Sequence, residues 1–236
     1  MNLTSLCVTC PNRKSGFCGT VLGEHPGKTE PATNWQRFFP VRAGGQIATR
    51  DQVSNDILVL CTGWAFRYLQ LEDGRRQILQ FLMPGDILSP ATIFEKRYLY
   101  SAKALTEVMV SEFPRAEVRE RCASRPDVQS AIANCSVAEI RDATELATML
   151  GQCSAEERIV HLLLRLMPRI AARNVIREHR YPFPLRQQHI ADAVGLTPVH
   201  VSRVFGLLRE RGIMSISEGV LRVFNMPELE RLGSLK

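Results

Sequence analysis

Three of the seven cysteines stand close together near the N-terminus, in the pattern Cys7-x2-Cys10-x7-Cys18. Thiolate sulfur is a soft ligand that suits zinc and iron–sulfur clusters, and a four-iron cluster needs four such ligands. The spacing therefore predicts a cluster or a zinc ion bound by this segment; the alternative is that these thiols bind nothing. Because the cysteine count is odd and the chain is long enough to form a core, a disulfide scaffold is not expected.

A second group of residues has the types and spacing to read DNA. Residues 187–206 match a helix-turn-helix, with a turn glycine at Gly195, a capping Thr197 and Pro198 in the first turn of the second helix. If the apolar residues of the second helix face inward, helical geometry turns four other residues outward and leaves one residue at the edge of that outward face. The outward set is Val199, Ser202, Arg203 and Gly206, and the edge residue is His200.

Several of these side chains have a specific chemistry for a base edge. Arg203 can donate two hydrogen bonds to guanine O6 and N7, and Ser202 can bond a base edge or a phosphate. Val199 can pack against a thymine methyl group. The predicted DNA-binding residues are Thr197, Val199, His200, Ser202 and Arg203.

The charge distribution favours the same end of the chain. The net charge is +6 over 236 residues, and the sequence pI is about 9.1. Residues 155–236 hold 13 Lys or Arg and 8 Asp or Glu, whereas residues 1–154 hold 17 and 16. The C-terminal third is therefore expected to meet a polyanion.

The elements that must position these residues follow from the hydrophobic period. Residues 38–113 show short β-like runs between turn signals, which predicts a compact barrel or sandwich. From residue 126 the period changes to 3.6; Gly151 is expected to close that helix, and Ser154 to Glu157 form a capping box for the next. We expect an α+β protein with a cysteine-rich extension (1–34), a β domain (35–122), a long helix (123–153) and a winged DNA-binding domain (154–236).

The long helix carries an apolar stripe formed by Ile132, Cys135, Ile140, Ala143, Leu146 and Leu150. Packing within its own domain is one explanation. Pairing of a thinly covered helix with its twin in a homodimer is the other. The second explanation makes Ile132, Ile140, Ala143, Leu146 and Leu150 the predicted dimerisation residues, while Cys122, Cys135 and Cys153 are expected to be small core residues.

This arrangement resembles the CRP/FNR superfamily of bacterial transcription regulators over essentially the whole chain. The motifs that carry the resemblance are Gly63, Pro84-Gly85-Asp86, Glu112-Phe113-Pro114, Ala155-Glu156-Glu157-Arg158, and Gly195-Leu196-Thr197 with Ser202-Arg203. The resemblance implies an N-terminal β-roll (a cyclic-nucleotide-binding-like jelly roll), a long dimerisation helix and a C-terminal winged helix-turn-helix. It also implies a homodimer that binds palindromic double-stranded DNA and contacts RNA polymerase.

The N-terminal motif, with Pro11 after Cys10, resembles the oxygen-sensing FNR, FnrL and FixK branch, where it binds an oxygen-labile [4Fe-4S] cluster. In cluster-bearing members the fourth cysteine precedes a Glu-Φ-Pro run, and here Ser111 holds that position. Cys61 is the substitute candidate, because the third and eighth strands of such a roll resemble jelly-roll neighbours. An oxygen ligand from Ser111 or Glu112 is the alternative. The implied ligand set is Cys7, Cys10, Cys18 and Cys61.

Two further departures from the family concern what the chain recognises. Members that bind cyclic AMP carry an Arg-Ser pair whose Arg grips the phosphate, whereas this chain has Tyr100-Ser101, so no cyclic nucleotide is expected. Where members have a Glu that accepts from cytosine, this chain has Val199. The half-site is expected to be related to the family's TTGAT-like sequence without being identical to it.

Other classes of protein are disfavoured. A cupin-type metalloenzyme with a DNA-binding tail would need His ligands inside its barrel, yet the only His before residue 161 is His25. The sequence has no nucleophile elbow, phosphate loop or His-x3-His pair, so an enzyme is not expected. No apolar stretch approaches the roughly 20 residues of a spanning helix and no signal peptide is present, so a cytoplasmic protein without a membrane partner is expected. The alternative kept open is a regulator of this fold whose cysteines bind zinc or nothing and whose effector is different.

Overall fold

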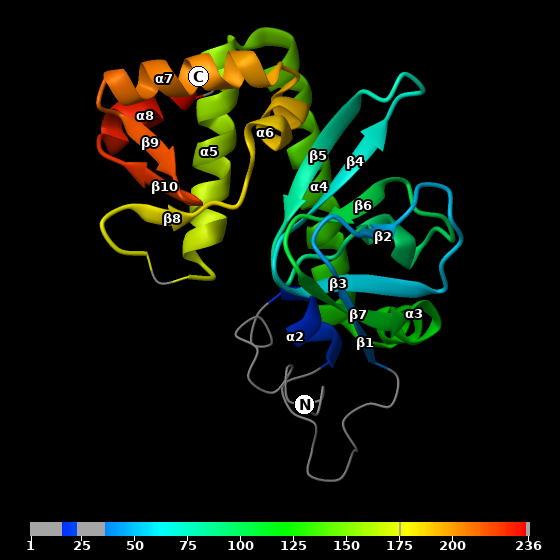
Figure 1. Ribbon diagram of the computed structural model, residues 1–236. Coiled ribbons are helices and arrows are strands. Elements are labelled where there is room, and N and C mark those ends of the chain that lie inside the picture. Colours follow the sequence, from blue (N-terminus) through cyan, green and yellow to red (C-terminus); the bar gives the residue numbers. More distant parts are fainter. Residues whose placement is uncertain (1–15, 23–35, 175, 235–236) are drawn as a thin grey trace. The chain divides into compact units, whose positions relative to one another are not determined.

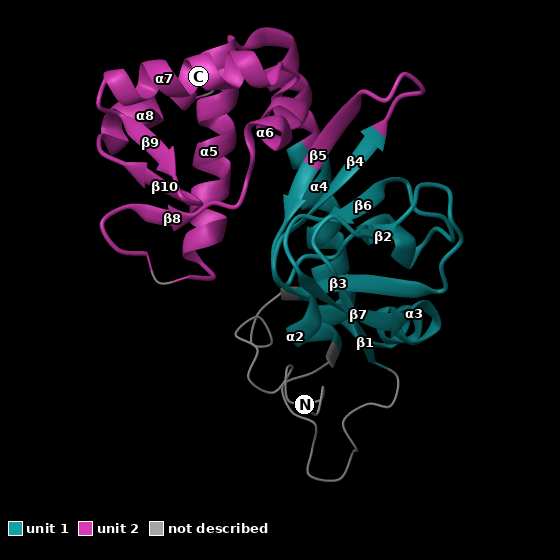
Figure 2. Ribbon diagram, in the orientation of Figure 1, with its two compact units in different colours: residues 1–69, 80–142 teal, residues 70–79, 143–236 magenta. Residues whose placement is uncertain are grey.

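The computed structural model describes residues 16–22, 36–174 and 176–234, which divide into two compact units (Figures 1 and 2). The first unit contains the chain up to Leu69 and Gln80–Asp142, and the second contains Gln70–Leu79 and Ala143–Lys236. Cys7 and Cys10 lie outside the described residues, so Cys18 alone represents the N-terminal motif. Among the described helices, none has the length and apolar character to cross a membrane.

Two sheets form the roll (Figure 1). One has the strand order β1-β7-β3, from β1 (Arg37–Val41), β3 (Asp56–Thr62) and β7 (Val108–Pro114). The other has the order β2-β6-β4-β5, from β2 (Gln46–Ala48), β4 (Ala65–Gln70), β5 (Arg76–Leu82) and β6 (Ser101–Ala104). A short 3-10 helix, η2 (Pro90–Ile93), follows β5. The pairing of β3 with β7 is antiparallel and sets Val59 opposite Ser111.

Strand β3 is buried on both of its faces. Leu58 and Leu60 belong to the core cluster that also contains residues of β2, β4, β5 and β6. Ile57 and Val59 belong to a second cluster with residues of α2 (Gly16–Leu22), α3 (Arg115–Ser124) and α4 (Pro126–Gln152). Double burial explains why this strand is a continuous apolar run instead of an alternating one.

The long helix α4 has 27 residues and extends to Gln152. The expectation that Gly151 ends it is wrong, because Gly151 lies inside the helix on its exposed side, where a glycine is tolerated at a modest cost. The predicted capping box is confirmed: Ser154 Oγ accepts from the Glu157 amide at 3.3 Å, and Glu157 Oε2 accepts from the Ser154 amide at 2.7 Å. It starts α5 (Ala155–Ala171).

The second unit is a winged helix-turn-helix, which together with the roll and the long helix confirms the predicted fold class (Figure 2). After α5 it contains β8 (Arg180–Pro182), α6 (Gln187–Val194), α7 (Pro198–Glu210), β9 (Met214–Ser217), β10 (Val220–Val223) and α8 (Met226–Gly233). The sheet order is β8-β10-β9. Glu218 and Gly219 both have positive φ, as a tight two-residue hairpin turn requires.

The tip of the β4–β5 hairpin, Gln70–Leu79, belongs to this second unit. Asp192 of α6 forms an ion pair with Arg76 and accepts from Gln188 Nε2 at 2.6 Å. Gln77 Nε2 donates to the carbonyl of Ala193 at 2.9 Å. These contacts connect the hairpin tip to the first helix of the helix-turn-helix.

Candidate nucleic-acid interface

The turn between α6 and α7 is built by two residues with special backbone roles. Gly195 ends α6 in the left-handed region at φ 65°, where a Cβ would stand 3.1 Å from Leu150 Cδ2. Thr197 caps α7, since its Oγ1 accepts from the His200 amide at 3.3 Å. Pro198 follows in the first turn, where its missing N–H is not needed.

Helix α7 has one buried face and one exposed face. Its buried residues are Val201, Val204 and Leu208. All the predicted DNA-binding residues are exposed: Thr197, Val199, His200, Ser202 and Arg203. Two apolar side chains lie on this surface, with Val199 69% exposed and Leu207 48% exposed. Leu207 was not among the predicted residues, although its spacing of four residues from Arg203 was an available signal in the sequence.

Arg203 and His200 supply the donors of this face. Within the part of the chain that the structure describes, no carboxylate forms an ion pair with Arg203. Its guanidinium is therefore available for a planar acceptor pair such as guanine O6 and N7. The His200 ring lies 2.9 Å from Thr197 Oγ1 through Nδ1. The face therefore combines hydrogen-bond donors with apolar contacts, which is the chemistry that major-groove readout requires.

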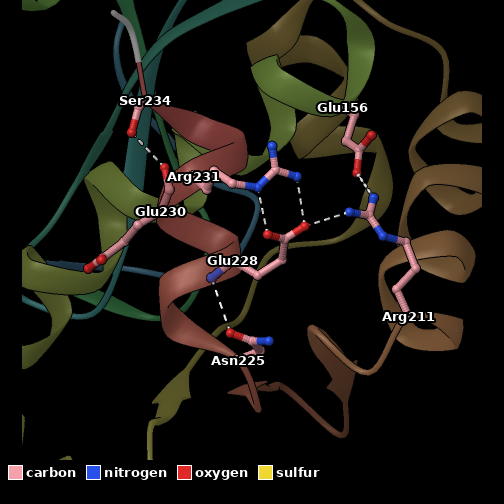
Figure 3. Close-up of polar contacts among 7 residues, drawn as sticks. All are labelled: Glu156, Arg211, Asn225, Glu228, Glu230, Arg231 and Ser234. Atoms are coloured by element: carbon pink, nitrogen blue, oxygen red, sulfur yellow. Dashed lines mark hydrogen bonds and ion pairs between the residues drawn. The ribbon is translucent and has the colours of Figure 1, made fainter.

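A charged network holds the C-terminal end of α7 (Figure 3). Arg211, the C-cap of α7, donates to Glu156 of α5 at 2.6 Å and to Glu228 of α8 at 2.9 Å. Arg231 makes a bidentate pair with the same Glu228, at 2.7 and 2.8 Å. Hydrogen bonding by Arg231, followed by Arg211, lowers the pKa of Glu228 to about 2. The network fixes the exposed helix to its neighbours without using residues of the DNA-facing surface.

The predicted dimerisation residues separate into three groups by exposure. Ile140 is 67% exposed and Ala143 is exposed, so both are available to a partner. Ile132 is 2% exposed in the core cluster of the roll, and the expectation that it faces a partner is corrected, because the chain itself covers it. Leu146 is half-buried, and Leu150 is half-buried beside Gly195.

The exposed side of α4 carries a different set of small and apolar residues. They follow one another at alternating intervals of four and three residues: Ala133, Val137, Ile140, Thr144, Ala147 and Gly151, all exposed. We call this set the α4 stripe. An alternation of four and three is the spacing of a helix that pairs with another helix.

The cysteine site is described only in part. Cys18 lies in α2 and packs, half-buried, against the same cluster as Ile57 and Val59 of β3. Cys61 is half-buried and lies two residues after Val59 on that strand, where the pairing with β7 is irregular. The described residues alone hold no group of three His, Cys, Asp or Glu that could bind a metal ion, and Cys7 and Cys10 lie outside them.

Both oxygen-ligand candidates already have partners. Ser111 is fully buried, and its Oγ accepts from Gln36 Nε2 at 2.7 Å. Glu112 forms an ion pair with Arg37 at 3.4 Å. Cys61 has a partner as well, since its Sγ donates to the Val59 carbonyl at 3.9 Å, so existing contacts do not separate the three candidates. Cys61 differs from the other two in offering a sulfur ligand, the type that iron–sulfur clusters use.

The remaining cysteines have packing roles. Cys122 and Cys135 lie half-buried against the outer cluster of the roll, as expected for small core residues. Burial raises the pKa of the Cys135 thiol, and the nearby Asp86 and Glu139 raise it further. Cys153 is half-buried, and its carbonyl accepts from Arg158 Nε at 2.8 Å.

Comparison with known proteins identifies the family. Residues 157–232 match a Crp-like helix-turn-helix domain, and residues 39–125 match a cyclic nucleotide-binding domain. The chain is 30% identical over 226 residues to the transcriptional activatory protein AadR of Rhodopseudomonas palustris, covering 95% of this chain and 92% of that protein. The chain belongs to the CRP/FNR family of transcription regulators. It is a DNA-binding regulator and not an enzyme, in agreement with the sequence analysis.

Other CRP/FNR proteins resemble it over most of their length. The nitrogen fixation regulation protein FixK of Bradyrhizobium diazoefficiens is 28% identical over 228 residues, covering 97% of this chain and 94% of that protein. The structure of FixK2 from Bradyrhizobium japonicum matches with a TM-score of 0.77 at 24% identity, over 85% of this chain and 98% of that one. The structural match supports the fold.

The roll of this CRP/FNR protein holds a buried ion pair that the sequence analysis missed. Arg67 of β4 is 4% exposed, and its Nη1 lies 2.7 Å from Glu139 Oε1 of α4. The guanidinium also lies over the Tyr100 ring, 5.1 Å from its centroid. Burial raises the pKa of Tyr100, and Glu139 adds to the shift. A charged residue inside the apolar strand 65–69 was the only available signal in the sequence.

Proposed function

We propose that this regulator binds a palindromic DNA site as a homodimer paired through α4, and that a [4Fe-4S] cluster on Cys7, Cys10, Cys18 and Cys61 sets its DNA affinity. The observation that carries the DNA-binding part is the exposed face of α7, where Arg203 has no carboxylate partner among the described residues. RNA polymerase as a protein partner and a cytoplasmic location stay predictions.

Support for the homodimer comes from the α4 stripe. Val137 and Ile140 are 53% and 67% exposed, and the other members are small enough for close helix approach. A twofold dimer presents two copies of α7, so its half-sites should lie about one helical turn, roughly 34 Å, apart. This spacing is the geometric reason for a palindromic site.

Support for the cluster comes from the positions of Cys18 and Cys61. Phe17 and Val21 flank Cys18 and bury it against the cluster that contains Ile57 and Val59. Cys61 follows Val59 by two residues on β3, at the point where the register against β7 shifts. We infer that Cys18 and Cys61 belong to a ligand set completed by Cys7 and Cys10. A cluster bound there would supply sensitivity to oxygen.

Anaerobic purification of the full chain tests the proposal. We expect iron and inorganic sulfide in equal amounts, little zinc, and a DNA affinity that falls on exposure to air. Cys61→Ala should lower the iron content as much as Cys10→Ala, whereas Cys153→Ala should not change it. If the protein contained zinc or no metal, and its DNA affinity were the same before and after exposure to air, the sensing proposal would be overturned. The family assignment would stand.

A further inference from the structure

The Thr197 hydroxyl makes two contacts with one residue. It accepts from the backbone N–H of His200 at 3.3 Å and lies 2.9 Å from Nδ1 of the same residue's ring. A hydroxyl has one proton to donate and two lone pairs that accept. The amide occupies one lone pair, so the hydroxyl can either donate its proton to Nδ1 or accept from Nδ1–H through the other lone pair.

We adopt the first of these two directions, which places the proton of the neutral imidazole. When Nδ1 accepts from Thr197 Oγ1, the proton of the neutral ring is on Nε2. When the ring is protonated, Nε2 carries a proton as well. In both forms the far edge of His200, an exposed residue, offers an N–H donor.

His200 and Arg203 are three positions apart on α7 and so lie on neighbouring parts of the helix surface. Three residues span about 4.5 Å along a helix axis, which is close to the roughly 3.4 Å step between base pairs. Side chains from the N-terminal part of a recognition helix contact base edges. The two donors can therefore reach adjacent base pairs.

We propose that His200 is a specificity-determining residue, whose Nε2–H donates to a purine N7 or a thymine O4 on the base pair next to the guanine read by Arg203. The proposal rests on the DNA-binding function proposed above. On the strand that His200 contacts, cytosine presents an N4 donor instead of an acceptor and is disfavoured. Val199 cannot replace this contact, because its exposed side chain has no hydrogen-bonding atom. Thr197 acts through His200 and is a positioning residue.

The first experiment uses the full chain and a palindromic duplex selected by the wild-type protein from random DNA. Single atoms of the duplex are removed with purine analogues that carry C–H in place of N7 and thymine analogues that lack O4. Loss of one hydrogen bond should weaken wild-type binding by about 2- to 12-fold at one base beside the Arg203 guanine. His200→Ala should bind the unmodified duplex more weakly than the wild-type protein does, and modification of that base should cause no further loss of affinity.

Two variants separate base reading from structure. His200→Gln keeps an N–H donor near the Nε2 position and should retain the sensitivity at that base, whereas Arg203→Ala should lose sensitivity at the adjacent guanine instead. Imidazole nitrogen chemical shifts, assigned with His200→Gln, should show Nε2 protonated in the free protein. Thr197→Ser keeps the hydroxyl and should give the wild-type shifts and base preference.

The outcomes distinguish this inference from the proposed function. If the wild-type protein selects no DNA sequence, the proposed function fails and the inference with it. If it selects a sequence, but wild type and His200→Ala lose affinity equally at every modified base, the inference is overturned and the function stands. A neutral ring with the proton on Nδ1 would also overturn the role given to Thr197.

Discussion

The guanidinium of Arg211 donates to Glu228 Oε1 at 2.9 Å, which connects the last residue of the α7 region to α8 (Figure 3). Arg211 also reaches Glu156 of α5 at 2.6 Å. The opposite end of α7 is fixed by the Thr197 cap. The exposed helix is therefore held at both of its ends, while its outward side chains stay available for DNA.

We predict that the thermal stability of Glu228→Gln changes less at acidic pH than that of the wild-type protein. The pKa of Glu228 is lowered from 4.5 to about 2, so its ionic contribution is full above 4.5 and is lost as the pH falls towards 2. Thermal unfolding of wild type and Glu228→Gln should differ near neutral pH and converge over that range. Glu230→Gln on the same helix is the control and should follow the wild type. Equal melting temperatures of wild type and Glu228→Gln at neutral pH would contradict the role of the network.

The buried pair Arg67–Glu139 should be costly to break and cheap to replace. Arg67→Met leaves the half-buried carboxyl group of Glu139 without its guanidinium partner, and we expect the free energy of unfolding to fall by about 1–3 kcal/mol. Arg67→Met with Glu139→Leu should recover most of this loss, because apolar groups of similar volume can substitute for a buried pair.

Urea unfolding measures both variants. The control is Arg75→Met, which breaks an exposed pair with Asp73 and should leave the free energy of unfolding nearly unchanged. If the double variant were as unstable as Arg67→Met alone, the loss would come from packing and not from an uncompensated charge.

Charge on the α4 stripe should separate the protomers. Ile140→Glu and Val137→Glu place a carboxylate in the proposed apolar seam, where it has no partner, so we expect monomers and weaker DNA binding. Ala138→Glu is the matched control, because Ala138 is exposed but lies off the stripe. Light scattering that gives a dimer for all three variants would exclude this face as the interface.

The helix-turn-helix could be predicted from the sequence because its signals are local. Gly195, Thr197 and Pro198 each have a backbone role that depends on their immediate neighbours, and the structure gives each of them that role. The capping box at Ser154 is local in the same sense.

The exposed side of α4 could not be predicted in this way. Ile132 and Ile140 are both apolar and helical, yet the roll covers the first and leaves the second exposed. Helical periodicity shows which residues share a face but not what covers that face. Two further contacts also join residues that are distant in the sequence. One is the hydrogen bond from Gln36 to the buried Ser111, and the other is the ion pair of Arg67 with Glu139.

Binding of one selected palindrome, measured by fluorescence anisotropy at a single fixed salt concentration, tests sequence-specific DNA recognition by α7 most directly. Arg203→Ala should lower the preference for the palindrome over unrelated DNA, since a bidentate guanine contact supplies about 1–3 kcal/mol of discrimination at each half-site. Arg209→Ala, an exposed arginine in the last turn of the same helix, should keep that preference. We expect the wild-type protein to bind the full palindrome more tightly than a single half-site. An unchanged preference in Arg203→Ala, with half-site and palindrome bound equally by wild type, would contradict the account.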